Sequence, residues 1–402
     1  MVFNYEHTAL VLGMFETGLG VGRSLGKKGI KVFGFDFKKD IGFYSTYIKA
    51  YLCQHPTKEP NLLLEELMAF SKSQTHTPVL FVTSDTFLEF VAKYSNELKP
   101  YYLFNLSSSE LIRKISNKYE QFILASEAGT SLPSTFRISS GYELEKALPQ
   151  LKFPVFIKAL DVNNWRKLVG SITKGFVMLN ERELNEKIKI LLSKDLQVII
   201  QEIIPGPDTL HFKYCACIGA DGRILLEFTL RKLRQSPIRY GVGAVVESVD
   251  YPELLIEGRK LFQNIGYRGV GSAEFKLDER DGKLKLIELN PRYWQQNSLP
   301  TACGMNFAFM DYLEDTGQNP EPITEFTINI KWVNRHMDFN SYIQYRNAGE
   351  LSFWEWRKSL AGKKVYSHFS WNDLLPILYD IEFGLKLVRV PWLLFKKCFP
   401  RT

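Results

Sequence analysis

One short segment, KLKLIELNPRYWQQN at residues 283–297, ends in three side chains that can do chemistry. Its first half alternates basic and apolar residues, as a half-buried strand does. The alternation reaches Glu288 and Asn290, and the strand then stops at Pro291 and Arg292. A carboxylate, an amide and a guanidinium at one strand end are groups that bind metal ions and oxyanions.

A second alternating segment, residues 269–278, precedes this strand, and the turn sequence ERDG joins the two as a hairpin. If residues 280–282 form a three-residue loop, Glu274 lies directly opposite Glu288. The same register predicts that one face of the hairpin carries two sets of side chains: Val270, Ser272, Glu274 and Lys276 from the first strand, and Leu284, Leu286, Glu288 and Asn290 from the second.

Two carboxylates that face each other at roughly 5 Å repel and destabilise a sheet. A hard divalent cation removes this cost, and the oxygens of Glu274, Glu288 and Asn290 suit Mg²⁺, which usually keeps substrate phosphate oxygens in its shell. Arg292 would then lie beside the metal and neutralise oxyanion charge. The alternative is an edge hairpin whose glutamates point to water. The alignment of two Glu and one Asn before Pro-Arg favours the metal site.

Two upstream lysines stand where a phosphorylated ligand would need them. Lys158 ends the apolar strand FPVFIKAL at 153–160, where a buried ammonium is costly without an anionic partner. Lys118 opens an expected helix, whose dipole already favours anions. An ordinary surface lysine is the alternative at each position, and it is the stronger alternative for Lys118.

The segment QVIIQEIIPGPD, residues 197–208, is an apolar strand that breaks at Pro205 and Pro207. An adenine ring needs an apolar slot with a polar group beside it, and a strand that runs into such a hinge offers both. In this interpretation Glu202 accepts a hydrogen bond from the exocyclic amine, and Asp208 reaches the ribose.

The first 115 residues alternate expected strands and helices, which is typical of a parallel, doubly wound sheet. The glycines of GLGVG, residues 18–22, followed by Asp36, suggest a dinucleotide site, but the spacing is G-x-G-x-G instead of G-x-G-x-x-G. We therefore expect a Rossmann-like domain whose glycines permit a tight strand-to-helix turn. The expected strands are 8–13, 30–36 and 78–85, and the expected helices are 19–29 and 86–98.

From residue 117 the pattern changes to α+β, with mostly antiparallel strands. A boundary is expected at GQNPEP, residues 317–322, and the remaining segment is aromatic and basic. The expected helices are 117–129 and 181–193, and the expected strands are 153–160, 175–179, 197–204, 212–219 and 223–232.

The composition limits the class of protein. The 402 residues include 51 Lys and Arg against 44 Asp and Glu, a net charge of +7 that suits anionic ligands but not a nucleic-acid arm. Five scattered cysteines without a CxxC, and an N-terminus without a signal-peptide pattern, predict reduced thiols in a cytoplasmic protein. No apolar run reaches the length of a membrane span, and the six histidines have no metal-ligand spacing.

Taken in order, Lys118, Lys158, QEIIPGPD, GSAEFKLD and ELNPR resemble the ATP-grasp superfamily. Residues 1–115 resemble the Rossmann-like domain that precedes the ATP-grasp fold, residues 116–318 the ATP-grasp domain itself, and residues 319–402 form a C-terminal extension. The segments LRKLRQSPIRYGVG and NPRYWQQNSLPTACGMN resemble carboxylate–amine ligases of the D-aspartate ligase type. Two features depart from the superfamily: Ala159 replaces its usual Pro, and the phosphate-covering loop 161–175 has only two glycines.

The resemblance implies the role of each site residue. It implies ATP and Mg²⁺, with Mn²⁺ as an alternative metal, and no protein nucleophile. Lys118 and Lys158 would bind the phosphates, and Arg292, with Lys232 and Arg231, would act at the substrate carboxylate or acyl-phosphate. A solvated basic loop is the alternative for Lys232 and Arg231. The adenine and ribose would contact Gln201, Glu202, Ile203, Ile204 and Asp208, and the metal ligands would be Glu274, Glu288 and Asn290.

The predicted function is therefore ATP-dependent ligation of a small-molecule carboxylate and an amine, with no nucleic-acid partner. Two alternatives remain open: a nicotinamide-dependent oxidoreductase and a non-catalytic nucleotide-binding protein with a ligase fold. The tail 383–402 is basic and apolar, which predicts either docking on the protein or contact with the inner face of a membrane. The acid, the amine and the oligomeric state are not determined by the sequence.

Overall fold

The computed structural model describes residues 5–160, 165, 168–169 and 175–379. The N-terminal part is a four-stranded parallel sheet in the order β3-β2-β1-β4, as the doubly wound pattern predicts. Between β1 and β4 the strand order reverses, and ligands of such sheets bind at this point, beyond the carboxyl ends of the strands. The strands are β1 (Ala9–Leu12), β2 (Val32–Asp36), β3 (Ile48–Leu52) and β4 (Val79–Val82), and the helices are α1 (Glu16–Gly26), α2 (Pro60–Lys72), α3 (Asp85–Lys93), α4 (Ser95–Leu98) and α5 (Ser109–Ser116).

The glycines of residues 18–22 lie inside helix α1 (Glu16–Gly26), so the prediction that they form a strand-to-helix turn is wrong, while the helix expected at 19–29 is confirmed over residues 19–26. They permit close packing instead: a Cβ on Gly18 would lie 1.9 Å from the carbonyl oxygen of Gly13, and one on Gly20 would lie 2.0 Å from the side chain of Asn297. The turn itself is made by Gly13, whose φ of +96° suits only glycine.

The second sheet is small and antiparallel, in the order β5-β8-β6-β7. Its apolar face packs on α7 (Gly141–Ala147) and α9 (Glu181–Leu192), while Phe156 on the other face stacks on Tyr240 at 5.2 Å. Because residues alternate between faces, Lys158 lies on the same face as Phe156. The strands are β5 (Thr135–Ile138), β6 (Val155–Ala159), β7 (Gly175–Met178) and β8 (Val198–Glu202).

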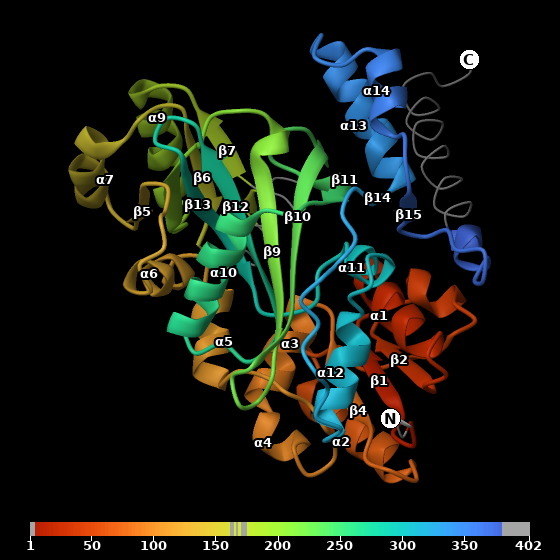
Figure 1. Ribbon diagram of the computed structural model, residues 1–402. Helices are drawn as coiled ribbons and strands as arrows, with labels where there is room; N and C mark the ends of the chain where they lie inside the picture. The colour runs from red at the N-terminus through yellow and green to blue at the C-terminus, as the bar shows by residue number, and fades with distance from the viewer. Residues whose placement is uncertain (1–4, 161–164, 166–167, 170–174, 380–402) are drawn as a thin grey trace, which may run out of the picture.

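The third sheet has seven strands in the order β13-β12-β9-β10-β11-β14-β15 and forms the centre of the molecule (Figure 1). One face packs on α6 (Glu120–Glu127) and α10 (Pro252–Asn264), and the other on the N-terminal domain with α11 (Ser298–Ala302) and α12 (Phe307–Asp315). The strands are β9 (His211–Ile218), β10 (Ile224–Ser236), β11 (Val242–Ser248), β12 (Gly269–Asp278), β13 (Lys283–Asn290), β14 (Lys331–Val333) and β15 (Lys364–Tyr366).

The C-terminal extension is part of this sheet. Its strands β14 and β15 continue the sheet beyond β11, and α13 (Arg335–Asn347) packs on β10 and β11, followed by α14 (Phe353–Ser359). A break in sequence composition at residues 317–322 therefore does not correspond to a break in the sheet. The expected membrane contact or docking of the tail 383–402 lies outside the described residues.

A buried ion pair fastens the extension to the N-terminal domain. Arg23 of α1 donates to Asp373 at 2.7 Å, and the two side chains are only 9% and 0% exposed. Asp373 also accepts hydrogen bonds from the Ser45 hydroxyl at 2.7 Å and from the backbone amide of Thr46 at 2.9 Å. Arg23 donates in addition to the carbonyl of His368 at 2.7 Å. Every strong polar group in this cluster thus has a partner on another segment.

Replacement of Asp373 by alanine should destabilise the protein by about 3–5 kcal/mol, because it leaves the Arg23 guanidinium buried without a counterion. The measurement is the urea midpoint of unfolding. The control is Glu186→Ala, which removes the exposed pair with Arg182, whose side chains are 65% and 87% exposed, and should cost less than about 0.5 kcal/mol. Equal midpoints for the two variants would contradict the fastening role of Asp373.

Candidate active site

Glu274 of β12 lies directly opposite Glu288 of β13, which confirms the predicted register. The structure reaches this register differently from the expectation, because the turn has four residues, 279–282, instead of three. A β-bulge corrects the offset: Phe275 pairs with Leu286 and Glu274 pairs with Glu288, so Ile287 is left without an opposite residue.

The bulge also changes which side chains share a face. Leu284 and Leu286 pack with Phe275 in the core under α6 and α10. The prediction that they share a face with Glu288 and Asn290 is therefore wrong. Without the bulge Glu288 would point into that core. The bulge at Ile287 is what turns the carboxylate toward Glu274.

Two buried lysines hold Glu274. Lys232 of β10 donates to it at 2.8 Å and Lys213 of β9 lies 3.1 Å from it. Burial alone would raise the pKa of Glu274, but the ammonium groups of Lys213 and Lys232 lower it well below its usual value. Lys213 was not among the predicted site residues. The available signal was a lysine within the otherwise apolar strand FKYCACI.

Lys118 holds the second carboxylate. It lies just before α6 and forms an ion pair with Glu288, whose pKa the ammonium lowers to about 2 although burial acts in the opposite direction. The side-chain nitrogen of Asn290 is 3.4 Å from the second oxygen of Glu288. The structure thus brings Lys118, Glu288 and Asn290 together as the sequence predicts.

Lys158 reaches the cleft from the small sheet. Its ammonium donates to the amide oxygen of Gln201 at 2.6 Å, and Gln201 in turn donates to the Thr135 hydroxyl at 3.1 Å. Burial lowers the pKa of Lys158 to about 8, Glu288 raises it, and Lys118 lowers it further. A lysine with a neutral partner is available to bind an anion.

Two buried polar atoms on the same face of the large sheet have no hydrogen-bond partner among the described residues: His211 Nδ1 and Ser272 Oγ. His211 lies two residues before Lys213, and Ser272 lies two residues before Glu274, so all four share this face. Burial, followed by Lys232 and Lys276, lowers the pKa of His211 well below its usual value. Unpaired buried polar atoms are costly, which is consistent with a polar ligand in this cleft.

Only some of the residues expected to contact the adenine and the ribose are free to bind a ligand. Gln201 binds Lys158, and Ile204 is buried and can form an apolar wall. Glu202 instead accepts from Arg280 at 2.7 Å and from the backbone amide of Ser134 at 3.2 Å. Ile203 follows strand β8 and is partly buried.

Asp208 is occupied by contacts within the protein. One of its oxygens accepts from Gln235 at 2.8 Å, and the other contacts the hydroxyl of Tyr345 in the C-terminal extension. Nothing in this geometry supports a ribose contact for Asp208.

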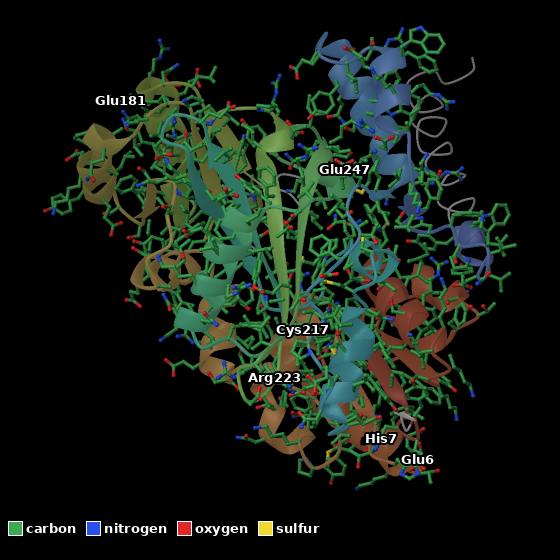
Figure 2. The ribbon with its side chains drawn as sticks, in the orientation of Figure 1. Glu6, His7, Glu181, Cys217, Arg223 and Glu247 are labelled. Carbon is green, nitrogen blue, oxygen red and sulfur yellow. The ribbon has the colours of Figure 1, made fainter. Side chains whose placement is uncertain are left out.

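Arg231 and Lys232 are consecutive on β10 and therefore point to opposite faces of the sheet. Arg231 donates to Glu247 of β11 at 3.0 Å, and Lys331 of β14 lies 3.2 Å from the same carboxylate. Figure 2 shows Glu247 near the C-terminal extension. The expectation that Arg231 reaches the same site as Lys232 is wrong in this structure.

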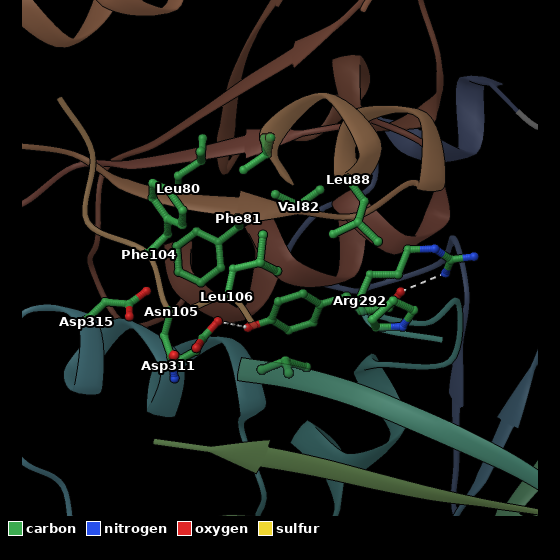
Figure 3. A pocket seen from close by; sticks show the side chains of 14 residues that line it. Leu80, Phe81, Val82, Leu88, Phe104, Asn105, Leu106, Arg292, Asp311 and Asp315 are labelled. Carbon is green, nitrogen blue, oxygen red and sulfur yellow. Dashed lines mark hydrogen bonds between the residues drawn. The ribbon is translucent and has the colours of Figure 1, made fainter. Parts of the chain in front are cut away.

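Arg292 follows β13 and reaches the carboxyl end of the N-terminal sheet. It donates to both oxygens of Asp85 at 2.6 and 2.9 Å, just after β4. Beneath it lies a hollow of about 30 Å³, which has room for only a few water molecules (Figure 3). In this hollow Tyr293 donates to Asp311 at 2.7 Å, and burial raises the pKa of Asp311 to about 7.

The donor set fits magnesium. No group of three or more His, Cys, Asp or Glu side chains in the described part of the chain could hold a metal ion by itself. Two carboxylates and an amide are what Mg²⁺ uses when substrate phosphates and water complete its shell. Glu274, Glu288 and Asn290 are therefore the residues that would hold it.

Comparison with known proteins identifies one curated relative. No family model matches the chain. The D-aspartate ligase of Enterococcus faecium (strain Aus0004) is 24% identical over 282 residues, which is 66% of each chain. The chain thus spans just under two thirds of that relative's length. The predicted resemblance to the D-aspartate ligase type is confirmed at this level of identity.

Solved structures show the fold. The N5-carboxyaminoimidazole synthetase of Staphylococcus aureus superposes with a TM-score of 0.63, 17% identity and 82% coverage of both chains. A biotin carboxylase of Campylobacter jejuni gives a TM-score of 0.62 at 18% identity, over 82% of this chain and 75% of that one. The L-amino acid ligase of Bacillus licheniformis gives 0.59 at 14% identity, over 80% and 76%. The chain has the ATP-grasp fold, as predicted.

No helix in the described part of the chain is long and apolar enough to cross a membrane.

Replacement of Lys158 by methionine tests the buried charge in the cleft. The folded-state pKa of about 8 lies below the usual 10.5, so the charged lysine costs stability below pH 8 and this cost disappears as the pH rises to 10.5. Lys158→Met should therefore be more stable than the parent at pH 7, by up to about 3 kcal/mol, and the gain should shrink by pH 10.

The measurement is the urea midpoint of both proteins at pH 7, 8.5 and 10. Exposed Lys152→Met is the matched control and should show a small difference that does not depend on pH. A Lys158→Met gain that is absent at pH 7, or equal at all three values, would show that Lys158 carries no such penalty.

Proposed function

We propose that this chain, which has the ATP-grasp fold, is an ATP-dependent carboxylate–amine ligase that forms an amide bond and releases ADP. The observation that carries the proposal is the pair Glu274 and Glu288, directly opposite each other and surrounded by lysines from four other segments. A carboxylate pair suits a divalent cation, and an excess of ammonium groups suits a polyanion. Magnesium–ATP has both properties.

The proposed reaction has two steps. An oxygen of the substrate carboxylate attacks the γ-phosphorus of ATP, the bond to the β,γ-bridging oxygen breaks, and an acyl-phosphate and ADP result. The amine then attacks the acyl carbon, loses a proton, and inorganic phosphate leaves. Both steps depend on positioning and charge neutralisation and need no protein nucleophile.

Each lysine has a role that follows from its place. Lys118 and Lys158 bind the ATP phosphates, so Lys118 exchanges Glu288 for a phosphate when the nucleotide enters. Lys213 and Lys232 stand on the other side of Glu274 and bind the substrate carboxylate or the acyl-phosphate. Glu274, Glu288 and Asn290 would hold Mg²⁺, which would supply positive charge to neutralise the phosphates. Arg292, fixed by Asp85, supports the reacting carboxylate.

The substrate class is proposed from the curated relative. D-aspartate ligase is named for an amino acid, and we propose that this chain likewise activates an amino-acid carboxylate. The acceptor amine would belong to a precursor of the cell wall or of a surface polymer. The reaction consumes ATP, so we assign it to the cytoplasm or the inner face of the membrane.

The oxidoreductase alternative loses its structural basis. The glycines that suggested a dinucleotide turn lie inside α1, and Asp36 accepts a hydrogen bond from the backbone amide of Met14 at 2.6 Å. The other oxygen of Asp36 has no hydrogen-bond partner among the described residues, so the place of the glycines inside α1 is the observation that disfavours a dinucleotide site. A non-catalytic nucleotide-binding protein is disfavoured because the metal-type carboxylates and the phosphate-type lysines are all present.

Glu288→Gln should lower ADP formation by roughly 100-fold or more, because it keeps the shape of the side chain but removes a metal-binding charge. The measurement is ADP release with a panel of amino acids crossed with amine acceptors. Glu279→Gln, in the exposed turn of the same hairpin, is the control and should retain full activity. Normal turnover by Glu288→Gln at ordinary Mg²⁺ concentrations would overturn the metal assignment.

Magnesium–ATP should raise the thermal midpoint of the protein, whereas NAD⁺ should not. A ligand present at 100 times its dissociation constant adds about 2.7 kcal/mol to the free energy of unfolding. Differential scanning fluorimetry with each ligand at millimolar concentration makes the comparison. A shift with NAD⁺ and none with Mg–ATP would favour the oxidoreductase instead.

A further inference from the structure

A cavity of about 520 Å³ lies where the N-terminal domain, the ATP-grasp domain and the C-terminal extension meet. Its volume is in the range of small-molecule sites. Neither carboxylate of the pair, nor any of the four lysines around it, is among the residues that line this cavity. The walls come from α1 (Gly20, Arg23, Ser24, Lys27), from α11 (Ser298, Thr301, Ala302), and from β15 with the segment after it (Lys364, Val365, Tyr366, Phe369, Ser370, Trp371, Asn372).

The charge on these walls is positive. Among the described residues, no acidic side chain lines the cavity. Arg23 is neutralised by Asp373, but Lys27 and Lys364 have no acidic partner within 4 Å among the described residues. Burial, followed by Arg23, lowers the pKa of Lys27 from its usual value. Lys27 is exposed and Lys364 is partly buried, and their ammonium groups give the cavity a positive charge that suits an anion.

The segment that carries Lys364 also carries aromatic rings into the lining of the cavity. The rings of Phe369 and Trp371 meet edge to face at 4.8 Å, and Tyr366 lies 6.0 Å from Phe369. The indole of Trp371 is 81% exposed, which is unusual for so large an apolar ring. An exposed ring at the rim of a cavity is a surface on which a flat base or the apolar face of a sugar can stack.

Small polar groups also line the cavity. The hydroxyls of Ser24 and Thr301 lie 3.2 Å apart, and Ser298, Ser370 and Asn372 add further donors and acceptors. Hydroxyl and amide groups of this kind fix the orientation of a ring that carries hydroxyl groups. Positive charge, aromatic rings and small polar groups thus line the same cavity.

We propose that this cavity is a second binding site, which takes a phosphorylated ligand that carries a ring: a nucleoside diphosphate or a sugar phosphate. Lys27 and Lys364 bind the phosphate, and Trp371 with Tyr366 binds the ring. The site does not depend on the proposed ligase activity, because none of its residues belongs to the carboxylate pair or its lysines.

The test is isothermal titration calorimetry of the full-length protein with UDP, with glucose 1-phosphate and with inorganic pyrophosphate. Each titration is run with and without saturating Mg–ADP, so that binding in the ATP-grasp cleft is recognised as the part that Mg–ADP removes. We expect UDP or glucose 1-phosphate to bind in the presence of Mg–ADP, at least tenfold more tightly than pyrophosphate. The tighter of the two identifies the ring as a base or a sugar.

Two variants locate the site. Lys27→Gln combined with Lys364→Gln, and separately Trp371→Ala, should each weaken binding at least tenfold. Lys28→Gln is the matched control: it is the next residue after Lys27, lies 4.8 Å over the Phe309 ring, and does not line the cavity. Binding that survives both variants, pyrophosphate binding as tight as that of UDP and glucose 1-phosphate, or no binding of any probe at millimolar concentration would overturn the proposal.

Discussion

The site is organised by one electrostatic constraint: two carboxylates face each other on adjacent strands and must be neutralised. Glu274 and Glu288 could not both remain charged at this separation in a partly buried cleft without cations. The protein supplies these cations as four lysines, each from a different segment of the chain. Lys118 precedes α6, Lys158 lies near the end of β6, and Lys213 and Lys232 lie on β9 and β10. The small sheet, the large sheet and the α6 region are thereby drawn to one cleft, and ammonium groups exceed carboxylates in it. That excess is what makes the cleft suited to a polyanion.

The constraint also explains two irregularities of the backbone. The hairpin turn is one residue longer than the pairing of Glu274 with Glu288 requires, and the bulge at Ile287 restores that pairing. Strand β10 has a similar irregularity between Lys232 and Arg234. Before it, Lys232 faces Glu274. After it, Arg234 forms a buried ion pair of 2.6 Å with Asp338 of α13. Bulges near a functional site redirect side chains, and here they direct one charge to the cleft and one to the C-terminal extension.

The C-terminal extension is tied to the rest of the protein by buried charges at three places. Arg23 pairs with Asp373, Arg234 pairs with Asp338, and Glu16 contacts both Asn334 and His368. Each such group is costly if it loses its partner while it stays buried, so the three contacts together hold the extension in one position against the other two parts. This attachment creates the 520 Å³ cavity, because α1 and α11 form one side of it and the segment from Lys364 to Asn372 forms the other.

Sequence patterns determined the elements and most of the chemistry near the carboxylate pair. The strands that carry Lys158, Gln201 and Glu274 were expected within a few residues, because alternation and turn residues are local signals. The motif order also indicated the ATP-grasp fold.

Other features depended on tertiary structure. A bulge has no strong local signal, so the faces of Leu284 and Leu286 were assigned wrongly. The helix expected at 19–29 already contained Gly20 and Gly22, but the close packing of Gly18 on Gly13 and of Gly20 on Asn297 was visible only in the tertiary structure. The sequence already implied that Arg231 and Lys232, as neighbours on one strand, point to opposite faces. Only the assembled sheet shows that Lys232 and not Arg231 faces Glu274. Lys213, the attachment of the C-terminal extension and the second cavity all arise from contacts between segments far apart in the chain, and local sequence patterns do not encode which distant segments meet.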